Sequence, residues 1–185
     1  VEALVFHNVL TKFTGLEKTF LGWLSSWWRA ITNTRFPKEW IQPETPESRP
    51  YSKDDYSTAL QKLKTEYKQE LLSKGHWGHL ILDEAQDFHR SAHRLLNSVA
   101  VDLFHNMDAK DAPSITILAD ENQRINRDGG STIQDIKDAH DLVEENIYHL
   151  SQNYRNTTEI ALLSALFFAG ASTGTPDLPV RRGSK

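Results

Sequence analysis

Two adjacent carboxylates, Asp83 and Glu84, directly follow a short apolar run at residues 80–82. Such a run predicts a buried strand of a parallel sheet, and open α/β sheets bind their ligands at the carboxyl ends of the strands. An acid pair at that edge has the chemistry for phosphoryl transfer. Asp83 can hold Mg²⁺, a hard ion that prefers oxygen ligands, and Glu84 can orient or deprotonate an attacking water.

A structural explanation of the same residues competes with this one. Asp83 and Gln86 have a spacing similar to that of a helix capping box, and the apolar pattern that follows predicts a helix at 85–103. Acidic side chains in the first turn would also stabilise the helix dipole. The two explanations are compatible, and the acid pair alone does not decide between them.

Two further predicted strands, at 114–119 and 147–150, also end in polar side chains. Gln123 follows the first of them, and its amide can contact a phosphate or hold a water. Tyr154 and Arg155 follow the second; the ring can stack on a base, and the guanidinium offers a fixed fork of donors to phosphate oxygens. The other elements that the pattern predicts are a strand at 3–6, a helix at 132–143, and a helix at 157–169 that is apolar on nearly all sides and should be buried.

Composition restricts the class of protein. With 185 residues, 38% of them hydrophobic and 25% charged, the chain can build a globular core. With a net charge of −4 the chain is not basic overall, so nucleic-acid binding would need a local patch of Lys and Arg side chains. The absence of cysteine excludes disulfides and fits a reducing, cytoplasmic location. No apolar run approaches the roughly 20 residues of a membrane span, so no membrane partner is expected.

Residues 10–75 predict a helical insertion between two strands. Trp23 and Trp27 belong to an amphipathic stripe, which predicts core packing rather than a platform on which single-stranded bases stack. A proline-rich connector follows, and a second helix is expected from Asp54 or Asp55 to Gly75.

His89 and His93 lie four residues apart on the helix predicted at 85–103, a spacing that can bind a metal ion. A zinc site needs at least three protein ligands, and no third ligand is evident. We therefore expect a surface pair.

The motifs at the strand ends, taken in order, resemble those of superfamily 1 helicases of the UvrD/Rep type. Residues 82–87 (LDEAQD) resemble the Walker B motif of that family, residues 119–125 (ADENQRI) its third motif, and residues 150–156 (LSQNYRN) its fourth. The resemblance runs from about residue 79 to residue 168. Phe6 and Asn8 weakly resemble motif Ia, which lies on the DNA-binding side.

This resemblance implies an α/β fold with an incomplete RecA-like parallel sheet of the P-loop NTPase class, a helical insertion and no Walker A strand. Residues 1–155 would form a partial motor domain, with the insertion at about 10–75, and residues 156–185 would lead toward a second motor domain. The implied cofactors are ATP and Mg²⁺. The implied partners are single-stranded DNA (or RNA) and the remaining helicase domains.

The resemblance also implies a role for each matching side chain. Asp83 would coordinate Mg²⁺, and Glu84 would be the catalytic base. Gln123 would contact the γ-phosphate and couple it to DNA, while Arg155 would act as an arginine finger. Nucleotide binding is assigned to Asp83, Gln86, Asp120 and Tyr154, the last stacking on adenine, and nucleic-acid contact to Phe6 and Asn8.

Two departures from the family pattern bear on function. Residues 126–128 (NRD) lack the aromatic that usually follows the third motif, and no G-x-x-x-x-G-K-[ST] loop occurs. We expect that loop upstream of Val1 in a longer parent protein, and we expect this chain alone to hydrolyse ATP poorly or not at all. Two alternatives are a degenerate helicase-fold binding module without hydrolysis and a nucleic-acid-sensing ATPase that does not unwind.

Overall fold

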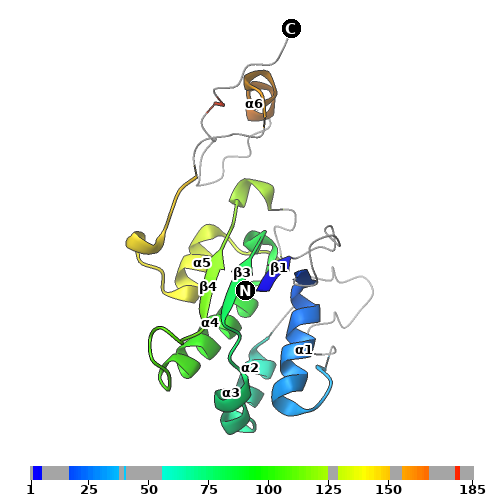
Figure 1. The fold of residues 1–185 in the computed structure, drawn as a ribbon. Coiled ribbons are helices and arrows are strands. Elements are labelled where there is room, and N and C mark those ends of the chain that lie inside the picture. Colours follow the sequence, from blue (N-terminus) through cyan, green and yellow to red (C-terminus); the bar gives the residue numbers. More distant parts are fainter. Residues whose placement is uncertain are drawn as a thin grey trace.

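The computed structural model describes residues 2–5, 17–37, 40, 56–124, 129–150, 156–166 and 178–179. These residues form a mixed α/β fold around a parallel sheet in the order β2-β1-β3-β4, which confirms the expected α/β class (Figure 1). The strands are β1 (Glu2–Val5), β2 (Glu17–Thr19), β3 (His79–Leu82) and β4 (Ser114–Ile117).

β3 is an interior strand of this sheet and carries the acid pair at its carboxyl end. Leu80 pairs in register with Glu2 of β1 on one side and with Ile115 of β4 on the other. Leu80 and Leu82 are fully buried, while the alternating residues of β3 are only partly covered, so one face of the strand packs against the core. The strand predictions at 80–82 and 114–119 therefore located the two strands that position the site.

The strand predicted at residues 147–150 is wrong. These residues follow a short 3₁₀ helix, η4 (Glu144–Asn146), and have no regular structure. Tyr148 and Leu150 are 86% and 92% exposed. A short apolar run becomes a strand only where a neighbouring strand pairs with it, and no pairing of this segment occurs within the described sheet.

Two of the predicted helices differ from their expected ranges. The helix expected to end at Gly75 is divided near Tyr67, and the helix expected from residue 85 starts only after a 3₁₀ turn, η2 (Ala85–Asp87). His89 caps the longer helix, since its Nδ1 accepts a hydrogen bond from the Ser91 amide at 3.3 Å. The helices are α1 (Phe20–Thr32), α2 (Ser57–Thr65), α3 (Lys68–Lys74), α4 (Arg90–Phe104), α5 (Ile133–His140) and α6 (Thr158–Ala165).

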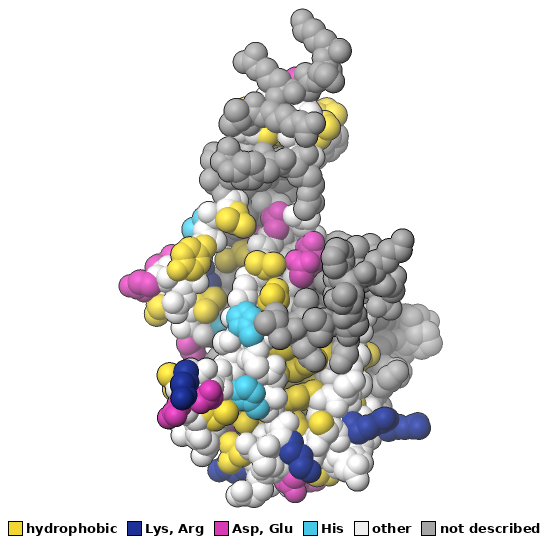
Figure 2. Space-filling model, viewed as in Figure 1, with side chains coloured by type: hydrophobic (Ala, Val, Ile, Leu, Met, Phe, Trp, Pro, Cys, Tyr) yellow, Lys and Arg dark blue, Asp and Glu magenta, His cyan; other side chains and the backbone are white. Residues whose placement is uncertain are grey.

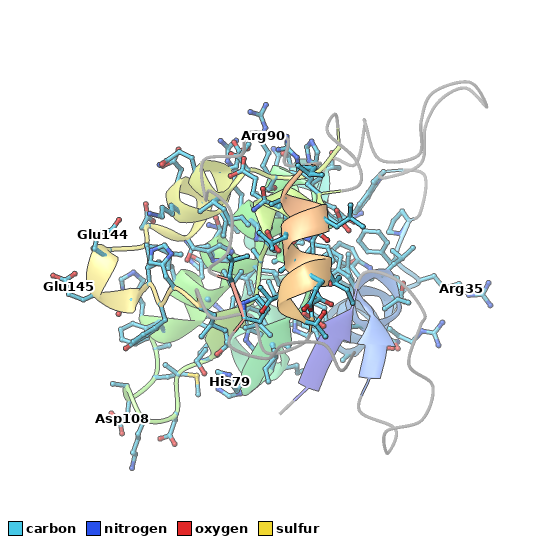
Figure 3. All side chains as sticks on the ribbon, turned by 90° about the horizontal axis from the view of Figure 1, so that it is seen from above. Arg35, His79, Arg90, Asp108, Glu144 and Glu145 are labelled. Carbon is cyan, nitrogen blue, oxygen red and sulfur yellow. The ribbon has the colours of Figure 1, made fainter. Side chains whose placement is uncertain are left out.

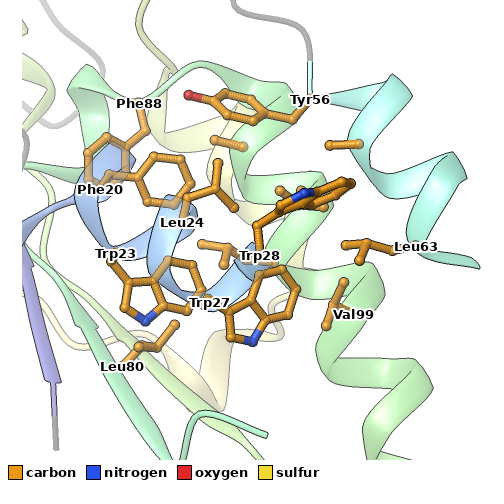
Figure 4. Close-up of a cluster of buried hydrophobic side chains, with 14 of the residues drawn as sticks. Phe20, Trp23, Leu24, Trp27, Trp28, Tyr56, Leu63, Leu80, Phe88 and Val99 are labelled. Carbon is orange, nitrogen blue, oxygen red and sulfur yellow. The ribbon is translucent and has the colours of Figure 1, made fainter. Parts of the chain in front are cut away.

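The aromatic stripe of α1 lies in the core, as predicted (Figure 4). Trp23 and Trp27 stack with ring centroids 5.4 Å apart, and both are buried. The Trp27 indole N–H donates to the Gly75 carbonyl at 2.7 Å, which ties α1 to the segment that enters β3. Because these indoles are buried, they are not available to stack on nucleic-acid bases.

α6 does not have the burial predicted for residues 157–169. Ile160, Leu162, Leu163 and Leu166 are each more than half exposed, and Figure 1 shows α6 apart from the sheet. An apolar pattern shows that a helix needs cover, but it does not identify the residues that supply it. None of the helices in the described ranges has the length and apolar character needed to cross a membrane.

Candidate functional site

Glu84 has an unusual backbone conformation, with φ 51° and ψ 43°. Among the described residues, the other two non-glycine residues with positive φ are Asn33 and Asp141. They follow the ends of α1 and α5, where this conformation is an ordinary helix cap. Glu84 instead follows a strand. The left-handed conformation costs an L-residue about 1–2 kcal/mol, and such strain is retained at functional sites when the surroundings hold it in place. This marks the acid pair as the candidate site.

Backbone hydrogen bonds hold the corner formed by the acid pair. The Leu118 amide donates to the Leu82 carbonyl at 2.9 Å, and the Ala85 amide donates to the Leu118 carbonyl at 2.9 Å. The Glu84 amide donates to Asp83 Oδ1 at 3.0 Å. The pairing of β3 with β4 therefore continues around the acid pair and fixes it relative to the end of β4.

Gln86 is fully buried and joins the two strand ends. Its Nε2 donates to Glu84 Oε2 at 2.7 Å, and its Oε1 accepts from the Asp120 amide at 3.0 Å. The capping-box expectation for Asp83 and Gln86 is wrong, because α4 begins later and the Gln86 amide has these other partners. Gln86 is therefore a buried connector between the two strand ends, and its hydrogen bond restrains the Glu84 carboxylate.

The end of β4 supplies a second set of polar groups. Asp120 caps the 3₁₀ helix η3 (Glu121–Gln123), since its Oδ1 accepts from the Asn122 amide at 3.0 Å. Gln123 Nε2 donates to Asp120 Oδ2 at 2.7 Å, and the Gln123 side chain is exposed. Asp83, Glu84, Gln86, Asp120 and Gln123 therefore share one edge of the sheet, as the strand predictions required.

The donor set of this edge is compatible with Mg²⁺. Asp83 and Asp120 offer carboxylate oxygens, and Mg²⁺ in phosphoryl-transfer sites typically takes one or two carboxylates together with water and phosphate oxygens. No group of three or more histidine or acidic ligands gathers anywhere among the described residues. Mg²⁺ does not need such a cage, and the role of Asp83 as its protein ligand stays a prediction.

The remaining predicted site residues, Phe6, Asn8, Tyr154 and Arg155, lie outside the described residues. Their proposed contacts stay predictions. The face seen in Figure 2 carries its Lys and Arg side chains singly rather than as a continuous patch over the described surface. In Figure 3, Arg35 and Arg90 project from the periphery at separate places.

A histidine pair beside the acid corner, with one ring fully buried and the other partly buried, was not predicted. His93 is fully buried in α4, so the expectation of a surface pair with His89 is wrong. Its ring contacts His140 of α5 at 3.0 Å and the Ala85 carbonyl at 3.0 Å. Burial lowers the pKa of His93 to about 4 and that of His140 to about 3, so both rings are neutral at pH 7.

One sequence signal could have revealed that burial. His93 lies three positions before Leu96 and ten before Leu103, so it shares their face of the helix. Both leucines are buried.

One pocket in the described part of the chain lies away from the strand ends. It measures about 230 Å³ and is lined by residues of α2, α3 and the end of α4, including Lys64, Leu71 and Asp102. Lys64 and Asp102 form an ion pair of 3.1 Å across it. We place the candidate site at the strand ends because the strained Glu84 backbone and the hydrogen-bonded polar side chains lie there.

Comparison with known proteins adds no further assignment. No model of a known protein family matches this chain, and no curated protein matches it.

Proposed function

We propose that this chain is part of an ATP-dependent DNA helicase or translocase and forms an incomplete RecA-like motor domain. The observation that carries the proposal is Glu84 at the carboxyl end of β3. Its backbone is held in a strained conformation, and its carboxylate accepts a hydrogen bond from Gln86. The motif order from Walker B to the fourth motif supports the same assignment.

In this proposal the edge formed by β3 and β4 faces the terminal phosphates of ATP. A bound Mg²⁺, held by Asp83, would neutralise charge on the phosphate oxygens. Glu84 accepts a proton from the attacking water, and the hydrogen bond from Gln86 orients its carboxylate. Gln123 and Arg155 contact the γ-phosphate from the neighbouring segments.

The outer edge of β4 supports the expectation of a missing phosphate-loop strand. No described strand pairs with that edge, and unpaired edges of parallel strands are normally covered. A parallel strand added there would end beside Asp120, with β4 between it and Glu84, so a phosphate-binding loop at its end would lie at the same edge of the sheet. The exposed apolar surface of α6 supports a further domain packed against it. A cytoplasmic location belongs to the same proposal.

The test uses Glu84→Gln in the full-length protein that carries this chain. We expect ATP hydrolysis to fall about 100-fold or more, because a positioned general base contributes that much, while calorimetric MgATP affinity stays within about twofold. Glu145→Gln, at an exposed position on the periphery (Figure 3), is the matched control. The isolated chain should turn over ATP more slowly than about 1 s⁻¹, the lower range of typical enzymes.

The outcomes separate the candidate functions. Unchanged hydrolysis in Glu84→Gln removes Glu84 from its proposed role. A full-length protein that binds a partner without hydrolysing ATP is a degenerate binding module. Hydrolysis stimulated by nucleic acid without strand separation identifies the sensing ATPase.

A further inference from the structure

Two imidazoles, the fully buried His93 and the partly buried His140, connect α5 to the acid corner through α4. His140 is the last residue of α5, and its Nε2 lies 3.0 Å from Nδ1 of His93. On the other side of the His93 ring, Nε2 lies 3.0 Å from the carbonyl oxygen of Ala85. Ala85 directly follows Glu84, so the pair reaches the residue next to the proposed catalytic base.

The chemistry of these contacts determines where the hydrogens lie. A carbonyl oxygen can only accept, so Nε2 of His93 carries the hydrogen in that contact. Nδ1 of a neutral His93 is then an acceptor, and the hydrogen between the rings belongs to Nε2 of His140. The two bonds therefore run in one direction, from His140 through His93 to Ala85.

These two hydrogen bonds, called the histidine relay below, complete the hydrogen bonding of the peptide groups around Ala85. The Ala85 amide donates to the Leu118 carbonyl, and the Ala85 carbonyl also accepts from the Phe88 amide at 3.2 Å. The peptide groups on both sides of Ala85 are thus held, one by β4 and the other by α4. Such restraint is what a left-handed conformation at Glu84 needs in order to persist.

We propose that His93 and His140 are positioning residues of the nucleotide site, which hold the Glu84 carboxylate in its reactive orientation through the Ala85 carbonyl. The proposal rests on the function proposed above. Burying two polar rings is unfavourable unless their bonds are satisfied, and apolar side chains would fill the same space. The titratable groups that influence His93 from neighbouring positions are Asp135 of α5 and His89 before α4.

The first experiment tests the relay in the 185-residue chain without reference to activity. Nitrogen-15 NMR at pH 7 should show His93 and His140 as Nε2–H tautomers, with a coupling across the hydrogen bond between their rings. His140→Phe should abolish that coupling and leave the tautomer of His93 unchanged. An Nδ1–H tautomer at His93, or two rings that titrate near pH 6.5, would overturn the proposal.

The second experiment separates positioning from simple packing in the full-length protein. His93→Phe and His140→Phe should lower kcat about 10- to 100-fold, because small misplacements of catalytic groups have effects of that size. KM for ATP should stay within about twofold, since the relay touches no phosphate contact. His93→Gln should restore most of kcat, because its amide can donate to Ala85 and accept from His140.

The control is His105→Phe, at the exposed end of α4, which should leave kcat and KM unchanged. If His93→Phe does not fold, as judged by thermal unfolding, His140→Phe carries the comparison at a less buried ring. Unchanged kcat in folded variants of an active enzyme overturns the relay alone. A wild-type protein without ATP hydrolysis overturns the proposed function as well.

Discussion

Glu84 combines backbone strain with a charged side chain at one position. Its φ of 51° lies at the residue before the 3₁₀ helix η2 rather than after the end of a helix, so the usual left-handed C-terminal cap does not account for it. The carboxylate accepts a hydrogen bond from a fully buried amide, which limits its orientation. Strain that gives no benefit to stability is retained where function requires it.

The strain can be measured with two substitutions that both remove the carboxylate. In a regular helix or strand, a protein with glycine is usually less stable than the same protein with alanine by about 0.5–1 kcal/mol. At position 84 alanine would instead carry the cost of the left-handed conformation, about 1–2 kcal/mol. We expect Glu84→Gly to have a higher free energy of urea-induced unfolding than Glu84→Ala by about 1 kcal/mol. Greater stability of the alanine variant would show that the corner relaxes and stores no strain.

At the scale of single residues, the sequence predicted where the acidic and amide side chains lie but not which groups they hydrogen-bond to. Asp83, Glu84 and Gln123 come together because parallel strands deliver their carboxyl ends to one edge. The role of Gln86 depends on the Asp120 amide, 34 positions away, and that of His93 on His140, 47 positions away. Contacts of this kind arise from tertiary packing, and local spacing does not encode them.

The contact between α4 and α5 makes stability depend on pH. His93 and His140 have pKa values of about 4 and about 3 in the folded chain, mainly because burial disfavours their charged forms. The unfolded chain binds protons on both rings below about pH 6.5. Between these values the unfolded state binds more protons than the folded state, so stability rises with pH across this window and is lost as the pH falls.

We expect the free energy of unfolding to fall between pH 7 and pH 5 by up to about 1.4 kcal/mol per pH unit for each histidine. The double variant His93→Gln/His140→Gln should flatten this slope, while His105→Gln should preserve it. Urea titrations at several pH values provide the measurement. An identical slope in the double variant would show that other groups dominate.

The limits of sequence prediction at the element scale have a common cause. The amphipathic periods located α1 and α4, because one apolar face is enough to indicate a core-facing helix. The strand at 147–150 and the burial of α6 were predicted from apolar content alone, and both depend on a neighbour. Local composition shows that a segment is apolar enough to need burial, but it does not identify the part of the protein that covers it.

At the scale of the molecule, the exposed surface of α6 is the main departure from an ordinary globular unit. Leu162 and Leu163 are 52% and 60% exposed. The double variant Leu162→Gln/Leu163→Gln should change the free energy of unfolding by less than about 0.5 kcal/mol per site, while reducing self-association in sedimentation velocity. The buried control Leu96→Ala in α4 should lose about 2–5 kcal/mol. A comparable loss in the α6 variant would mean that α6 packs on the core.

The parallel sheet has a consequence for how the chain acquires its structure. No two strands of the described sheet form a hairpin; β3 pairs with β1 and β4 only across long intervening segments. Ladder bonds of this kind form only after large loops have closed, which places the fold among those of high contact order and slow folding. During synthesis the ribosome must release the chain through Ile117 before β3 can gain its second neighbour. Until then the open edge of β3 must avoid pairing with other nascent chains.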